Sequence, residues 1–173
     1  KLGHRHRASS ALVLAGGTGI NVARALKRLD VPVVATGLAG GRTGTRIVEE
    51  LTEEAILNDF VRIREESRTS TAVVDPTAGT YTEINEWGPK VTPAELDILL
   101  EKLRYLAQGA DAVVFAGSLP RGVAESFYAD ASRELARRVA DGEEGDEPAQ
   151  GGVDAGAELA FAQHREGRRA GPV

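Results

Sequence analysis

The stretch Ala11–Arg24, with the sequence ALVLAGGTGINVAR, decides the expected fold. Ala11–Ala15 is a short apolar run, which favours a buried strand, and Gly16–Gly19 predicts a turn directly after it. From Ile20 to Leu29 the apolar residues recur at helical spacing along one side. The stretch therefore predicts one unit of an α/β sheet, in which a strand passes through a glycine turn into a helix.

The same alternation continues along the chain. Further strands are predicted at Val31–Gly37, Asp59–Arg64 and Asp111–Ala116, and further helices at Thr45–Glu54, from Thr92 to Gln108, and at Ala124–Arg138. The second of these helices is predicted to start with a capping box, in which Thr92 is the N-cap, Pro93 is the first helical residue and Glu95 closes the box. Apolar strands that alternate with amphipathic helices predict an α/β fold with a doubly wound, largely parallel sheet. Ligands bind such sheets beyond the carboxyl ends of the strands, which here are Gly16–Asn21, Gly37–Gly44 and Gly117–Gly122.

One segment breaks this rhythm. Thr69–Asp75 and Thr80–Asn85 are both rich in residues that favour strands, and Pro76–Gly79 separates them. This pattern predicts a hairpin with a four-residue loop, and therefore a small antiparallel sheet beside the main one.

Composition excludes several classes of protein. The 173 residues suit one domain, and no apolar run approaches the roughly 20 residues of a membrane helix. Cysteine is absent, and the three histidines, His4, His6 and His164, argue against a histidine-based zinc enzyme. The net charge of −5 does not favour a nucleic-acid-binding protein. No signal peptide is visible, so a cytoplasmic location is expected.

The charge is unevenly distributed. Residues 1–138 carry 18 basic and 18 acidic side chains, whereas residues 139–173 carry 3 basic and 8 acidic ones. The second segment is rich in Gly and Ala and shows no helical or strand period, so it is predicted to be a largely disordered acidic tail. A truncation or a shift of reading frame near Val139 would also account for this change in composition.

The glycine turn itself is chemically suggestive. Glycines allow a ligand to approach the backbone, helix N–H groups favour an anion, and the Asn21 amide suits sugar hydroxyls. A turn kept only for tight packing is an open alternative. A nicotinamide-binding Rossmann turn is a further one, but Val22 stands where its third glycine belongs, and no acidic residue ends the strand at Ala35–Gly37.

Four motifs in order give a more specific indication. Ala15–Arg24 with Leu29–Gly40, then Arg68–Ala72, then Thr82–Pro89, and finally Ala116–Gly122 together resemble the PfkB (ribokinase-like) carbohydrate kinases. The chain is most similar to the subgroup of 1-phosphofructokinase and tagatose-6-phosphate kinase. The resemblance implies a ribokinase-like fold whose enzymes transfer the γ-phosphoryl group of ATP, with Mg²⁺, to a sugar phosphate.

The resemblance also implies roles for individual residues. Gly16, Gly17 and Asn21 would contact the sugar, Arg68 would grip the phosphate already on the substrate, and Ser118 would lie in the same pocket. A guanidinium is a planar, permanently charged group that suits a phosphate. Read without the family pattern, Arg68 is an exposed strand arginine and Ser118 caps its own turn. Glu83 and Asn85 are assigned no catalytic role.

The family implies a lid as well. Strands near residues 1–10 and 69–85 would form a small sheet that covers the sugar, and a homodimer through this lid sheet is expected. His4 and His6 are then solvated lid residues rather than metal ligands. Two departures concern single residues: Thr18 stands where the subgroup commonly has lysine, and Asp30 replaces a usual glycine.

The match is also incomplete. The family carries its catalytic base in a Gly-Ala-Gly-Asp segment, which this sequence lacks, and Asp154–Ala157 is only a superficial echo of it. The Asn-x-x-Glu motif linked to Mg²⁺ and the adenine pocket are missing too. Residues 1–138 are therefore expected to be the amino-terminal part of a kinase domain, with no catalytic residue and doubtful binding of ATP and Mg²⁺. A sugar-phosphate-binding module without catalysis is the alternative.

Overall fold

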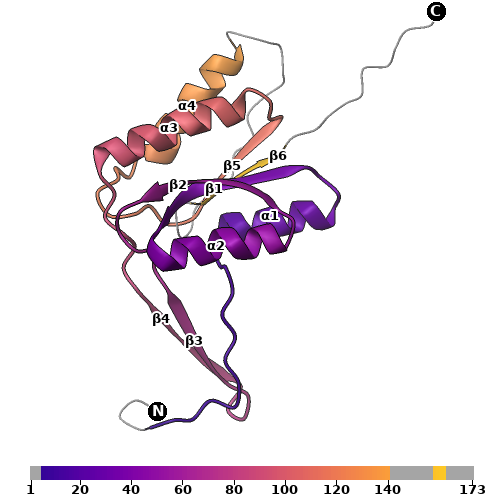
Figure 1. The fold of residues 1–173 in the computed structure, drawn as a ribbon, viewed down its shortest axis with the longest axis vertical. Coiled ribbons are helices and arrows are strands. Elements are labelled where there is room, and N and C mark those ends of the chain that lie inside the picture. Colours follow the sequence, from indigo (N-terminus) through magenta and orange to yellow (C-terminus); the bar gives the residue numbers. More distant parts are fainter. Residues whose placement is uncertain (1–4, 141–157, 163–173) are drawn as a thin grey trace, which may run out of the picture.

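The computed structural model describes residues 5–140 and 158–162 (Figure 1). Its elements follow the chain in this order: α1 (Thr18–Arg28), β1 (Val33–Gly40), α2 (Gly41–Glu53), β2 (Leu57–Ile63), β3 (Ser70–Asp75), β4 (Thr80–Asn85), α3 (Pro93–Ala107), β5 (Ala112–Ala116), α4 (Phe127–Ala140) and β6 (Glu158–Ala162).

The main sheet has the strand order β2-β1-β6-β5. β1 and β2 are parallel, and β6 is antiparallel to both β1 and β5, so β1, β2 and β5 run in one direction. The carboxyl ends of these three strands therefore lie at the same edge of the sheet. The prediction of a largely parallel α/β sheet is confirmed.

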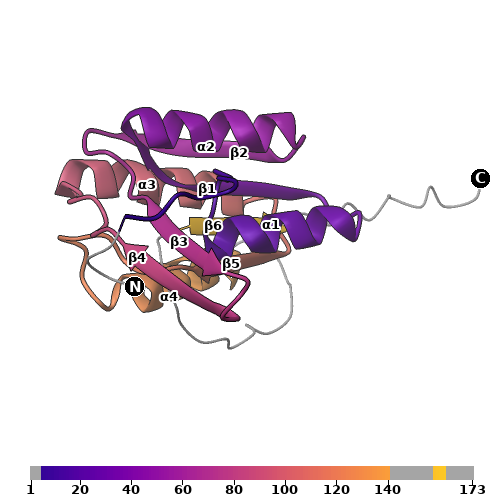
Figure 2. The same ribbon diagram turned by 90° about the horizontal axis from the view of Figure 1, so that it is seen from below.

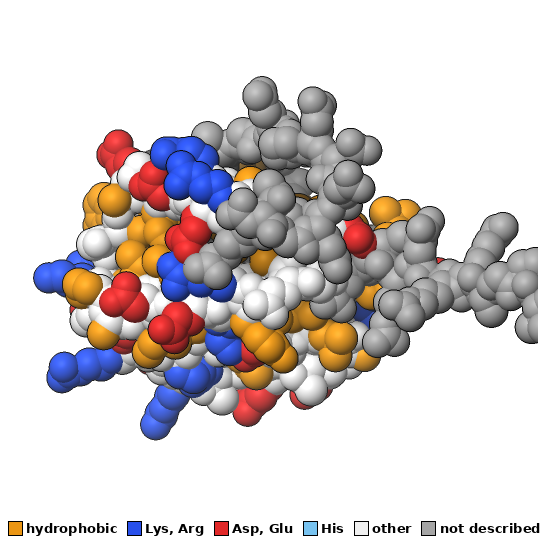
Figure 3. Space-filling view, turned by 90° about the horizontal axis from the view of Figure 1, so that it is seen from above, with side chains coloured by type: hydrophobic (Ala, Val, Ile, Leu, Met, Phe, Trp, Pro, Cys, Tyr) orange, Lys and Arg blue, Asp and Glu red, His pale blue; other side chains and the backbone are white. Residues whose placement is uncertain are grey.

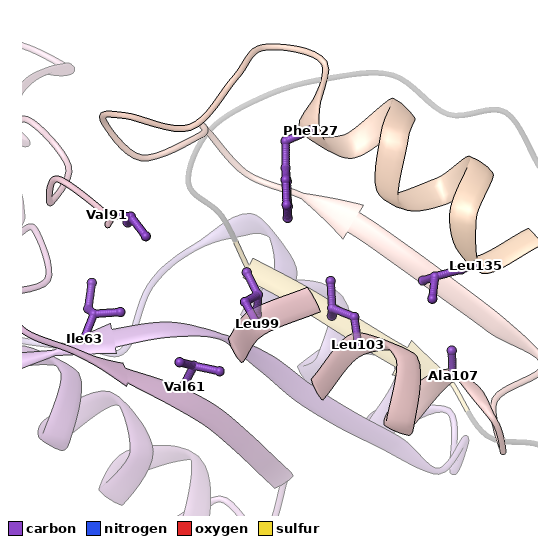
Figure 4. Packing of buried hydrophobic residues seen from close by; sticks show 8 residues of the cluster. All are labelled: Val61, Ile63, Val91, Leu99, Leu103, Ala107, Phe127 and Leu135. Atoms are coloured by element: carbon purple, nitrogen blue, oxygen red, sulfur yellow. The ribbon is translucent and has the colours of Figure 1, made fainter. Parts of the chain in front are cut away.

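Helices cover both faces of this sheet, as expected for a doubly wound fold: α3 and α4 lie above it and α1 and α2 below it in Figure 1, and Figure 2 looks onto the side that carries α1 and α2. α1 and α2 pack on one face, around a cluster of small and branched residues: Ala15, Ile20, Ala23, Val33, Ala35, Leu51 and Ile56. α3 and α4 pack on the other face, around a second cluster (Figure 4): Val61, Ile63, Val91, Leu99, Leu103, Ala107, Phe127 and Leu135. Burial of these two apolar clusters supplies the main driving force for folding.

β3 and β4 form a separate antiparallel sheet that projects away from the main one (Figure 1). Ser70 pairs with Asn85 at its base, and residues 76–79 make the turn, where Gly79 has a φ of 65°. Every residue of both strands is exposed. The predicted hairpin is confirmed, and we call this two-stranded sheet the lid.

The predicted strands at the amino terminus are wrong where the structure describes them. Residues 5–10 form no lid strand, residues 1–4 lie outside the described part, and Ala11–Ala15 is not a strand either. Leu12 is 79% exposed. For Ala11–Ala15, the place beside β1, the strand that follows α1, is not available, because β1 already has β2 on one side and β6 on the other.

The predicted disorder of residues 139–173 is also wrong in part. α4 extends to Ala140, and Glu158–Ala162 forms β6 between β1 and β5. An apolar sheet with a vacant position can order a short segment whose own sequence carries no clear period, because the two neighbours supply its backbone partners. Residues 141–157 and 163–173 lie outside the described part of the chain.

Figure 3 shows the face that carries α3 and α4, where basic and acidic side chains lie beside one another. This mixture agrees with the balanced charge of residues 1–138. Among the described residues, no helix combines the length and the apolar character needed to cross a bilayer.

The start of α3 has the predicted capping box. The Glu95 N–H donates to the Thr92 hydroxyl over 3.3 Å, and the Thr92 N–H donates to the Glu95 carboxylate over 2.8 Å. The Arg64 N–H, just after β2, donates to the same carboxylate over 2.7 Å. The hydrogen bonds from Thr92, and then that from Arg64, hold the pKa of Glu95 below its ordinary value.

Glu95 should therefore make the free energy of unfolding decrease at low pH. A lowered pKa in the folded state means that the carboxylate stabilises the protein fully above its unfolded pKa of about 4.3, and that this contribution is lost as the pH falls through the folded pKa. We expect chemical denaturation at pH 7 and at about pH 3 to show a smaller acid-induced loss of stability for Glu95→Gln than for the unaltered chain. Glu101→Gln, at an exposed position of the same helix, is the control. Equal losses in all three proteins would contradict this account of the cap.

Candidate functional site

Three segments that are distant in the sequence enclose one open cavity of about 390 Å³. They are the start of α1, the base of the lid, and the turn that follows β5. The lining residues are Gly17, Thr18, Asn21, Arg68, Ser70, Glu83, Asn85 and Ser118. All but the glycine carry polar side chains, so the cavity suits a hydrophilic ligand.

The first segment is the glycine turn that leads into α1. Gly17 has a φ of 127°, a left-handed conformation that a residue with a Cβ rarely adopts. Its carbonyl oxygen accepts a hydrogen bond from the Asn21 N–H over 3.0 Å, which closes the first turn of the helix. Asn21 is thereby fixed one turn from the helix start, with an exposed side chain at the cavity wall.

The second segment is held by an unusually close approach between two backbones. The Ser67 N–H donates to the carbonyl oxygen of Gly40, at the end of β1, over 3.0 Å. The Ser67 hydroxyl in turn accepts the Gly40 N–H over 3.0 Å. A Cβ on Gly40 would overlap the Glu65 carbonyl oxygen, so only glycine allows this contact. The contact fixes the backbone one residue before Arg68.

Glu66 strengthens the same junction. Its carboxylate accepts the N–H groups of Arg42 over 3.2 Å and Thr43 over 2.5 Å, which caps the start of α2. The hydrogen bonds from Thr43, and then that from Arg42, hold the pKa of Glu66 below its ordinary value. The loop that carries Arg68 is thus tied to both β1 and α2.

Arg68 itself is half-buried at the cavity wall. Among the described residues it makes no side-chain hydrogen bond and no ion pair. A guanidinium has five N–H donors, and partial burial makes it costly to leave them without acceptors. This arrangement favours an anionic ligand in the cavity.

The third segment is the turn after β5. Gly117 is buried with a φ of 99°, and the Tyr128 hydroxyl lies 3.0 Å from the Ala116 carbonyl oxygen and 2.8 Å from that of Gly117. The phenol from α4 therefore holds this turn from behind. Ser118 follows directly and lines the cavity.

The base of the lid adds residues to which the sequence alone gave no role. The Ser70 hydroxyl contacts the Asn85 amide oxygen, and it lies 3.3 Å from the Glu83 carboxylate. Ser70 pairs with Asn85 in the register of the two strands, and Glu83 lies two residues before Asn85, so the three share one face of the lid. The alternation of side chains along the two predicted strands could have placed these three residues on one face of the hairpin. Only the structure shows that this face borders the cavity.

Of the five predicted substrate-binding residues, four line this cavity: Gly17, Asn21, Arg68 and Ser118. The fifth, Gly16, precedes Gly17 in the same turn, is exposed, and is not among the lining residues. Thr18, noted for standing where a lysine is common, also lines the cavity. Arg68 is then the cavity's cationic side chain, and Glu83 is its carboxylate.

Residues 3–139 match the pfkB family of carbohydrate kinases. The chain belongs to this family. A possible 1-phosphofructokinase from Thermotoga maritima has a similar structure, with a TM-score of 0.73 and 35% sequence identity, and the match covers 81% of this chain and 45% of that one. Escherichia coli phosphofructokinase-2 in complex with fructose-6-phosphate has a TM-score of 0.57 and 26% identity, over 73% of this chain and 40% of that one.

These matches identify the fold and exclude the nicotinamide-binding alternative. The main sheet and the lid are those of a ribokinase-like fold, and the chain spans less than half the length of the two phosphofructokinases. The pfkB family is a kinase family, so the nicotinamide-binding interpretation of Gly16–Gly19 is set aside.

The two glycines of the turn should respond differently to substitution. Gly17→Ala forces a side chain into a left-handed conformation, which costs about 1–3 kcal/mol. Gly16 has no such φ, and an added Cβ there would meet no atom within 4 Å, so Gly16→Ala should change stability by less than about 0.5 kcal/mol. Chemical denaturation of both variants measures the difference, and equal effects would show that the turn is not built as described.

Proposed function

We propose that this chain carries the sugar-phosphate-binding part of a 1-phosphofructokinase-like kinase. Intact enzymes of this kind would transfer the γ-phosphoryl group of ATP to fructose 1-phosphate and produce fructose 1,6-bisphosphate. The observation that carries the proposal is the half-buried Arg68 guanidinium, which has no partner among the described residues and shares a polar cavity with Asn21 and Ser118. The family and the 1-phosphofructokinase-like structure support the same function.

The lining residues divide the work by chemistry. Arg68 offers paired N–H donors and a permanent charge to the phosphate of the substrate. The Asn21 amide can both donate to and accept from sugar hydroxyls, and the backbone beside Gly16 and Gly17 can approach the sugar closely. The Ser118 hydroxyl lines the same cavity and can both donate to and accept from the ligand.

We further propose that this chain does not phosphorylate sugar phosphates alone. Phosphoryl transfer needs a positioned base and donors for the developing charge, and the 173 residues contain no Gly-Ala-Gly-Asp segment to supply them. The family implies ATP and Mg²⁺. Among the described residues, no group of three His, Asp or Glu side chains lies close enough together to hold a metal ion.

The lid supports a proposal about assembly. Val73, Val74, Tyr81 and Ile84 are each more than half exposed on its two strands. Exposed apolar strand residues are stabilised when a second sheet covers them. We therefore propose a homodimer through the lid, in which each lid would also shield the sugar from water.

Sedimentation velocity measures the oligomeric state of the chain. We expect a dimer, and a monomer at concentrations of tens of micromolar would exclude the proposed assembly.

Arg68 gives the sharpest test of the binding site. Hydrogen bonds from a charged donor contribute about 1.5–3 kcal/mol, so Arg68→Ala should weaken the binding of fructose 1-phosphate by about 10- to 100-fold. Isothermal titration calorimetry on the full chain measures this affinity. The matched control is Arg64→Ala, which removes the same charge four residues earlier, from an exposed position outside the cavity.

The two variants should separate clearly. Arg64→Ala should leave the affinity within about twofold of the unaltered chain, since a distant exposed charge is screened by salt. Equal affinities for Arg68→Ala and the unaltered chain would overturn the assignment of the phosphate to Arg68.

A coupled assay for ADP tests the absence of catalysis. With fructose 1-phosphate, tagatose 6-phosphate or fructose 6-phosphate as substrate, and with ATP and Mg²⁺ present, we expect no turnover above the rate without protein. Binding without turnover is also what a sugar-phosphate-binding module would show. Steady turnover with any of the three would contradict both interpretations.

A further inference from the structure

The residue before the glycine turn is held in an unusual way. Ala15 belongs to no strand, yet both of its backbone polar groups are hydrogen-bonded to side chains. Its N–H donates to the Glu50 carboxylate over 2.8 Å, and its carbonyl oxygen accepts from the Arg24 guanidinium over 2.7 Å. Arg24 lies on α1 and Glu50 on α2, so side chains of two helices fix one backbone position.

Arg24 also reaches the cavity wall. Its Nη1 donates to the Asn21 amide oxygen over 3.4 Å, while its Nε and Nη2 donate to the two carboxylate oxygens of Glu54 over 2.7 Å and 2.5 Å. The bidentate pair with Glu54 orients the guanidinium plane. With one acceptor site of the Asn21 oxygen engaged in this way, the amide is oriented, so that its NH₂ group can donate to a ligand.

The network is built for orientation as well as for stability. The Arg24 and Glu50 side chains are only 19% and 17% exposed, so competition from water is reduced. The Arg24 hydrogen bond, followed by its charge, outweighs burial and lowers the pKa of Glu54, which keeps this partner ionised. Since residues 11–14 pair with no strand, these contacts determine where the chain enters the glycine turn.

We infer that Arg24 and Glu50 are positioning residues for the sugar-phosphate site, and that they act by fixing Ala15 and the Asn21 amide. The identity of the ligand as a sugar phosphate is taken from the proposed function, on which this inference rests. Neither residue lines the cavity, so each acts on the ligand through Ala15 and Asn21 rather than by contact. The ligand affinity thereby depends on how α2 packs against α1.

Conservative variants distinguish positioning from simple ion pairing. Arg24→Lys keeps the charge, but one ammonium cannot reach Glu54, the Ala15 carbonyl and Asn21 together. We expect Arg24→Lys, Arg24→Ala and Glu50→Ala each to weaken the binding of fructose 1-phosphate by about tenfold or more. In Glu50→Gln the amide oxygen can still accept the Ala15 N–H, so this variant should recover most of the affinity.

The matched control lies on the other face of the sheet. Arg104 on α3 donates to Glu134 on α4 over 2.6 Å, so it also joins two helices, but it touches no part of the cavity. Arg104→Ala should lower the melting temperature without changing the affinity. If Arg24→Lys binds as tightly as Arg104→Ala, the positioning role is overturned.

A second measurement needs no ligand. Amide hydrogen exchange should be at least about tenfold faster across Ala15–Asn21 in Arg24→Ala than in Arg104→Ala, because local opening governs exchange there. If the unaltered chain binds no fructose 1-phosphate, the proposed function fails, and this comparison still decides whether Arg24 fixes the turn. Equal exchange in the two variants would overturn the inference.

Discussion

The close approach of the segment Glu65–Ser67 to Gly40 and Gly41 is the contact on which the rest of the site depends. It brings the exit of β2 against the end of β1, where a side chain on Gly40 would not fit, and Ser67 then exchanges hydrogen bonds with Gly40. The chain leaves this junction directly into Arg68 and the lid. One backbone contact thus sets both the place of Arg68 at the cavity wall and the base of the lid.

Two arginines beside the site show how environment separates structural from binding roles. Arg24 has its donors occupied by Glu54, Glu50, Ala15 and Asn21. Arg68 is half-buried and has no such partners among the described residues. A guanidinium is charged at any physiological pH, so its partners decide what it does. The first is held by neighbouring groups of the protein, whereas the second lines the cavity with its N–H donors not engaged by the described residues.

Sequence reasoning reached the elements whose signals are local. The capping box at Thr92, the hairpin and the helical spacing from Ile20 to Leu29 each depend on residues a few positions apart, and the structure contains all three features. The prediction of a strand at Ala11–Ala15 was wrong, because an apolar run does not by itself show which strand it would pair with, and both sides of β1 are taken by β2 and β6. The strand at Glu158–Ala162 was not predicted, because it pairs with β1 and β5, which are far away in the sequence. Family resemblance, rather than periodicity, indicated Arg68 and Ser118 as site residues. The places of Ser70 at the cavity and of Arg24 beside it became visible only from contacts in the folded structure.

An NMR titration decides whether the three separate segments that line the cavity form one sugar-phosphate site. Fructose 1-phosphate is added to the ¹⁵N-labelled full chain, and the backbone amide signals are followed. We expect the signals from Gly17–Asn21, Arg68–Ser70 and Gly117–Ser118 to shift together and to fit a single dissociation constant. Shifts confined to one of these segments, or dissociation constants that differ between them, would contradict a single site.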